Sequence, residues 1–184
     1  MGQILQSVHR LCRGIDAFTE ASGTLVSWLS LLLIINTCAV VIMRYFLGTG
    51  SIAFQESITY IHAALFMLAM AYTLKRGGHV RVDVFYRNFS PRTQALVDVL
   101  GTLLLLMPVS VLILVMSWDY VANSWAIRET STEGAGLPFV YALKTLMLAL
   151  PVTLVLQGLA ELLKNLLFVL GLGGSHTPDK VEPL

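Results

Sequence analysis

Long apolar runs that no charged residue interrupts dominate the pattern along this chain. Such a run must reach about 20 residues to cross the hydrocarbon core of a bilayer as a helix. Three runs meet this length or come close to it, and a fourth, shorter run is extended by apolar residues on both sides; they are Leu25–Met43, Ser57–Leu74, Val99–Trp118 and Thr145–Ala160. The pattern therefore predicts four transmembrane helices, at about residues 24–46, 56–75, 93–120 and 139–168.

A buried core helix of a soluble protein is the alternative for any one of these runs. The whole chain argues against it, because 56% of its 184 residues are hydrophobic and only 12% are charged. A soluble domain carries about 25% charged residues, which help to cover its core. We therefore predict an all-α integral membrane protein, with residues 22–170 as its four-helix transmembrane domain.

Basic residues are distributed unevenly between the predicted connections. The connection at residues 47–55 has no charge, and the one at 119–137 is mainly acidic. The segment between the second and third spans has a single acid, Asp83, and five basic residues: Lys75, Arg76, Arg81, Arg87 and Arg92. Since basic loops stay on the cytoplasmic side, we expect the middle connection and both termini to be cytoplasmic.

Two shorter segments outside the spans have an amphipathic pattern. Apolar side chains recur at spacings of three and four in residues 1–21 and again from Val82 to Phe89. We expect both segments to be helices that lie in the cytoplasmic interface, although alternation from His79 to Phe85 also fits a short strand. Ser90-Pro91 is expected to cap the third span. Residues 171–184, rich in Gly, Pro and charges, are expected to form a disordered cytoplasmic tail.

Two charged residues flank the first connection. Arg44 lies at the end of the first span, and Glu56 lies at the start of the second. One interpretation is an ion pair that fixes this hairpin or binds a partner. The other is two separate interfacial charges, with Glu56 stabilised by the positive end of its own helix. The sequence leaves both interpretations open.

Few ionisable groups fall within the spans, where such groups are candidates for function. Asp98 lies about one turn inside the third span, and we expect it to form a structural salt bridge with Lys75 or Arg76. His62 lies within the second span. Haem coordination by His62 would require a second imidazole on a facing helix, so we expect a hydrogen-bonded packing residue. We predict no cofactor and no metal site in this chain.

Catalytic signatures are missing from the sequence. The chain has no nucleophile elbow, no HExxH and no glycine-rich phosphate loop, and Cys12 and Cys38 form no CxxC pair. It also lacks the paired, interrupted helices that build the midplane sites of carriers. Because we further expect few buried polar groups, the sequence predicts a static membrane subunit that supports another protein, and not an enzyme.

Residues near the predicted helix ends resemble a known family. The most specific run, from Gly78 to Asp83, follows the second span. The other matching residues are Arg44-Tyr45-Phe46, Glu56, Lys75-Arg76-Gly77, Glu129-Thr130-Ser131, Gly136-Leu137-Pro138 and Lys144. From Thr24 to Leu167, the chain resembles the small transmembrane subunit of TRAP (tripartite ATP-independent periplasmic) transporters.

This resemblance implies a sodium-coupled secondary uptake system in a bacterial inner membrane. A periplasmic binding protein would deliver an organic acid anion to a large membrane subunit, which holds the sodium and substrate sites. The small subunit would be a fixed scaffold, with these two proteins and membrane lipids as partners and no nucleic acid. Its outer loop, residues 129–137, is a candidate contact for the binding protein. The candidate structural and subunit-interface residues are Arg44, Glu56, Lys75, Arg76, His79, Arg81, Asp83, Asp98, Glu129 and Lys144.

Other classes of function are open to a four-helix membrane protein. A small exporter that acts alone needs a carboxylate deep in the bilayer, and Glu56 lies too near the surface. A membrane anchor of a redox complex that carries haem needs a second buried histidine, and a thiol oxidoreductase needs cysteine pairs. The sequence favours the transporter subunit over each of them.

Overall fold

The computed structural model describes residues 2–79, 86 and 88–172. Within these residues four stretches are long and apolar enough to cross a membrane, which confirms the predicted all-α membrane fold. The elements are α1 (Gly2–Tyr45), α2 (Ile52–Lys75), α4 (Pro91–Gly101), the π-helical turn η1 (Thr102–Leu106), α5 (Met107–Ala126) and α6 (Val140–Val169). α4, η1 and α5 follow one another without a break, so together they form the third span.

The predicted interfacial helix of residues 1–21 and the first span are one helix. α1 continues from Gly2 to Tyr45, so the expected boundary at residue 21 is not a helix end. The segment contains no proline, and a glycine inside a helix costs only about 1 kcal/mol, so nothing in the sequence interrupts it. The position of its first half in the membrane interface stays a prediction.

Local hydrogen bonds explain where two of the helices begin. The Ser51 hydroxyl accepts a hydrogen bond from the Phe54 amide, so α2 begins earlier than expected. The Ser90 hydroxyl accepts one from the Thr93 amide at 3.3 Å, and Pro91 is the first residue of α4. The predicted cap at Ser90-Pro91 is confirmed. Proline suits this position because its missing N–H would have no partner inside the helix.

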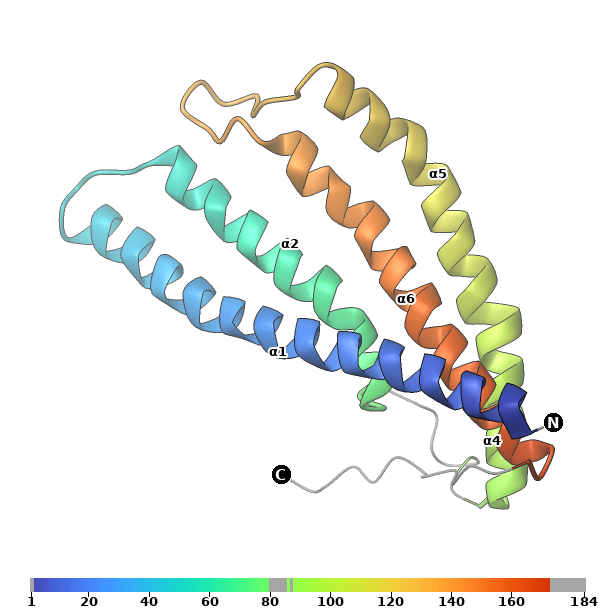
Figure 1. Ribbon diagram of the computed structural model, residues 1–184. Helices are drawn as coiled ribbons and strands as arrows, with labels where there is room; N and C mark the ends of the chain where they lie inside the picture. The colour runs from blue at the N-terminus through green and yellow to red at the C-terminus, as the bar shows by residue number, and fades with distance from the viewer. Residues whose placement is uncertain (1, 80–85, 87, 173–184) are drawn as a thin grey trace.

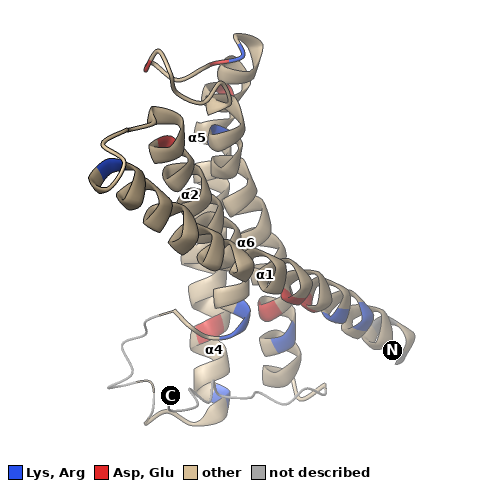
Figure 2. Cartoon of the chain, turned by 90° about the vertical axis from the view of Figure 1, so that its left-hand side faces the viewer, with Lys and Arg blue, Asp and Glu red and all other residues tan. Residues whose placement is uncertain are grey.

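The four spans lie side by side in the order α1, α2, α6, α5 (Figure 1). α6 is the central element and packs against α1, α2, α4, η1 and α5. The helices converge near the N-terminus and α4, which we call the terminal end. They spread apart toward residues 46–51 and 127–139, which we call the loop end (Figure 1). α1 crosses the other helices obliquely (Figure 2).

Small and polar side chains fill the contacts between the helices. The buried polar residues are Thr19, Asn36, Gln94, Ser110, Ser117, Ser124 and Gln157, and the buried apolar ones are Cys12, Val26, Ala71, Ala95, Val121 and Ala160. Many large apolar side chains are exposed, as expected where lipid surrounds the protein. The expectation of few buried polar groups is therefore wrong. Apolar burial does not drive helix association in lipid, so small and polar residues occupy the interfaces instead.

Candidate functional site

Charged residues of three helices gather near the terminal end (Figure 2). We call this group the terminal cluster. It consists of Asp16, Thr19 and Glu20 from α1, Lys75 from α2, Arg76 directly after α2, and Gln157, Glu161 and Lys164 from α6. The cluster joins segments that are far apart in the sequence.

Gln157 lies at the centre of the terminal cluster and is fully buried. Its amide oxygen accepts a hydrogen bond from the Thr19 hydroxyl at 2.7 Å. Its amide nitrogen donates to Asp16 at 3.0 Å and to Glu161 at 2.9 Å. Lys164 then binds the same two carboxylates, with its Nζ 3.1 Å from Asp16 Oδ1 and 2.7 Å from Glu161 Oε1. One ammonium and one amide thus hold two acidic side chains together.

The second half of the terminal cluster fixes the end of α2 to α1. Lys75 Nζ lies 2.6 Å from Glu20 Oε2 and also donates to the Asp16 carbonyl at 2.8 Å, while Arg76 binds the other oxygen of Glu20. This carboxylate raises the pKa of Arg76. The predicted salt bridge from Lys75 or Arg76 to Asp98 is wrong, because both basic side chains bind Glu20 of α1 instead. Asp98 instead accepts a hydrogen bond from the Tyr86 hydroxyl at 2.8 Å.

At the loop end, Glu56 holds the connection between α5 and α6. One carboxylate oxygen accepts a hydrogen bond from the Ser131 hydroxyl, and the other accepts one from the Leu137 amide at 2.6 Å. A Cβ atom on Gly136 would lie 2.6 Å from the Glu56 carboxylate, so this close approach requires glycine. The Arg44–Glu56 ion pair does not form among the described residues. The loop lies over Glu56, and Arg44 is exposed.

Two further residues predicted as candidates, Glu129 and Lys144, form an ion pair. Lys144 Nζ lies 2.5 Å from Glu129 Oε2 and 3.9 Å from the centre of the Tyr120 ring. The ammonium of Lys144 lowers the pKa of Glu129 below its ordinary value. Nearby, the Trp125 indole N–H donates to the Thr145 hydroxyl at 2.8 Å. These contacts tie the end of α5 to the start of α6.

The remaining candidates are not brought into either group. His79 is exposed just after α2. Arg81 and Asp83 lie outside the described residues. So does most of the predicted second interfacial helix, as do residues 173–184 of the predicted tail.

Sequence reasoning missed the α6 part of the terminal cluster. Gln157, Glu161 and Lys164 are spaced four and three apart, which places them on one helical face. The same spacing on α1 relates Asp16 to Thr19 and Glu20. A polar stripe inside an apolar helix was the signal available for finding them.

His62 is not the hydrogen-bonded packing residue that we expected. It is exposed, and its ring stacks on Phe66 with 6.5 Å between centres and an interplanar angle of 13°. It lies on a side of α2 that no described helix covers, which explains why no intrachain partner reaches it.

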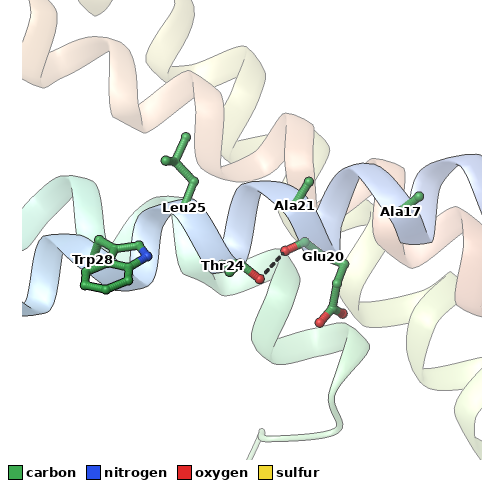
Figure 3. Close-up of a pocket in the computed structure, with 6 residues that line it drawn as sticks. All are labelled: Ala17, Glu20, Ala21, Thr24, Leu25 and Trp28. Atoms are coloured by element: carbon green, nitrogen blue, oxygen red, sulfur yellow. Dashed lines mark hydrogen bonds between the residues drawn. The ribbon is translucent and has the colours of Figure 1, made fainter.

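An open groove runs along α1 (Figure 3). Its lining residues are Ala17, Glu20, Ala21, Thr24, Leu25 and Trp28, all from this helix. The Thr24 hydroxyl donates to the Glu20 carbonyl at 2.8 Å, and the Glu20 carboxylate is already bound by Lys75 and Arg76. The groove therefore offers no free charged group to a substrate. Within the described residues, no three His, Cys, Asp or Glu side chains are placed to hold a metal ion.

Comparison with known proteins assigns the chain to a family. The sequence model described as "Tripartite ATP-independent periplasmic transporters, DctQ component" matches residues 33–168. Comparisons with curated proteins and with solved structures gave no match. The family match extends from the last third of α1 almost to the end of α6, well over half of the chain. This chain therefore belongs to the DctQ family, the small membrane component of TRAP transporters.

Proposed function

We propose that this chain is the fixed scaffold of a sodium-coupled TRAP transporter that imports an organic acid anion. It stands beside a large membrane subunit, which holds the sodium and substrate sites, and a periplasmic binding protein delivers the substrate. The chain itself needs no cofactor. Family membership supports the transporter assignment, and the contacts between the helices support the static role.

The terminal cluster is the observation that carries the scaffold proposal. A carrier needs polar groups that are free to bind a substrate and elements that move around it. Here Asp16, Gln157, Glu161 and Lys164 bind one another, and Glu20 binds the two basic residues at the end of α2. Moving α1, α2 or α6 would break several of these bonds at once. The arrangement suits a support and not a moving site.

A pull-down tests the partners. The chain, tagged at its C-terminus, is purified in mild detergent from native membranes that express the whole transporter. We expect a much larger multi-spanning protein to be recovered in equal amount. Reconstitution then tests the alternative of a carrier that acts alone. Sodium-dependent uptake into proteoliposomes by this chain alone would overturn the scaffold proposal.

Orientation is tested by chemical labelling. We propose that the loop end faces the periplasm and that both termini are cytoplasmic, because the basic residues from Lys75 to Arg92 follow α2. In a background with Cys12 and Cys38 replaced by Ser, Thr132→Cys should react with a membrane-impermeant maleimide on intact cells. His79→Cys should react only after the membrane is opened. The reverse pattern would contradict this orientation.

A further inference from the structure

One side of α2 presents an exposed stripe that extends from near one membrane surface past the centre of the membrane. Its members are spaced three and four apart, so they share one helical face; they are Ile52, Gln55, Thr59, His62 and Phe66. We call this the α2 stripe. His62 lies about 15 Å along the helix from Ile52, which is about half the thickness of the hydrocarbon core. Polar side chains are therefore exposed from near one membrane surface to the centre.

The polar groups of the α2 stripe have no hydrogen-bond partner within the described part of the chain. This holds for the side chains of Gln55, Thr59 and His62. An unpaired polar group in hydrocarbon is unfavourable by several kcal/mol. The stripe is thus unsuited to a surface that only lipid covers.

Exposed hydroxyl groups on α1 show how polar side chains that face lipid are hydrogen-bonded within this chain. Four of them donate to carbonyl oxygens of their own helix at 2.7 to 2.8 Å, and they are Thr24, Ser27, Ser30 and Thr37. Such bonds satisfy the hydroxyl without any partner. The imidazole of His62 is not satisfied in this way.

The outer side of α5 provides the opposite comparison. The exposed residues of η1 and α5 from Leu103 to Trp118 are apolar. They include Leu104 in η1 and Leu112, Val115 and Met116 in α5, which are 58 to 72% exposed. A surface of this kind matches lipid tails. These two exposed faces therefore have different chemistry: the α2 stripe presents polar groups that are unpaired within the described residues, and the face of the third span presents apolar side chains.

We propose that the α2 stripe is the surface on which a transmembrane helix of the large subunit docks. This inference rests on the proposed function and names the face that the partner occupies. The docked helix supplies a hydrogen-bonding side chain to His62 at mid-membrane and packs against Phe66. Polar groups join helices in lipid in this way.

Photo-crosslinking locates the partner directly. The probe p-benzoylphenylalanine replaces Thr59 or Phe66 in membranes that contain the whole transporter, and Leu112 or Val115 on α5 provide matched controls. We expect adducts with the large subunit from the two α2 positions and none from the α5 positions. Adducts with a second copy of this chain, or with lipid only, would overturn the docking face.

His62→Leu tests the hydrogen bond. Because His62 has no hydrogen bond within the chain, we expect the thermal midpoint of the isolated variant to stay the same or rise. Its affinity for the large subunit should fall about three- to eighteen-fold, the range measured for hydrogen bonds between membrane helices. Leu112→Met should leave the affinity unchanged. An unchanged affinity for His62→Leu would overturn the proposed bond.

Two different results would contradict the docking face and the scaffold role. If the wild-type chain captures no large subunit at all, the scaffold proposal itself fails. If the large subunit is captured but cross-links only to α5, the scaffold proposal stands and the docking face is wrong.

Discussion

At the residue scale, Gly23 sets how closely α1 and α2 approach each other. A Cβ atom at this position would lie 2.3 Å from the ring of Tyr72 and 2.6 Å from its Cβ, so rotation of the ring cannot make room. We expect Gly23→Ala to lower stability by about 1–3 kcal/mol through overpacking. Gly14→Ala, which meets nothing within 4 Å on the same helix, should be neutral or stabilising. Thermal melting in detergent measures both, and equal midpoints would contradict this contact.

Gln157 is the second residue whose identity the packing requires. Gln157→Glu keeps the shape but replaces the donor to Asp16 and Glu161 with a third carboxylate. We expect a loss of stability of about 1–3 kcal/mol at neutral pH. Protonation of the introduced carboxyl at lower pH restores a donor, so we expect the loss of stability to become smaller as the pH falls. A melting midpoint that shows no such recovery as the pH falls would contradict this account.

Glu129 should make the loop end sensitive to acid. Its pKa is lowered in the folded state by Lys144, so its contribution to stability is complete above its ordinary pKa. That contribution is lost as the pH falls through the lowered value. We expect the melting midpoint of Glu129→Gln to be lower than that of the wild type at pH 7. The difference between the two midpoints should disappear toward about pH 3, in the acid range where carboxyl groups titrate. A difference that is independent of pH would show that the ion pair contributes nothing.

At the element scale, Pro108 explains the π-helical turn η1. The Met107 amide donates to the Thr102 carbonyl, which makes a turn one residue wider than in an α-helix just before the proline. In a regular helix, the ring of Pro108 would clash with the carbonyl of Leu104, at about 3 kcal/mol. We expect deletion of Leu104 to be strongly destabilising, and Pro108→Ala to rescue it. If the effects of the deletion and of Pro108→Ala on the melting midpoint simply add, the wide turn has another cause.

The sequence predicted the helices better than the contacts between them. Apolar runs locate the spans because their length is a requirement of the bilayer, and Ser90-Pro91 is a local signal that proved correct. The pairing of Glu20 with Lys75 depends on how α1 packs against α2, and the pairing of Glu56 with Ser131 depends on where the loop before α6 lies. Neither is encoded in neighbouring residues, so the salt bridge of Asp98 with Lys75 or Arg76, which was chosen by nearness in the predicted topology, was wrong.

At the scale of the whole molecule, the terminal cluster and the loop-end contacts hold the spans together at both ends. We therefore expect the chain to move as one body during transport. Hydrogen–deuterium exchange of the complete transporter, with and without saturating substrate, should leave α2 and α6 unchanged while segments of the large subunit change. Substrate-dependent exchange within α6 would contradict a fixed scaffold.

The unbroken α1 also has a consequence for the lipids. Its 44 residues extend about 66 Å, roughly twice the thickness of the hydrocarbon core. The apolar run Leu25–Met43 accounts for only about 29 Å of this length and matches the core. The charged half of α1, from Arg10 to Glu20, must then lie outside the hydrocarbon. Because α1 is held to α2 and α6 and cannot tilt independently, we expect this half to rest among the headgroups beside the protein. Headgroup composition in the host membrane thus becomes a physical variable of the transporter.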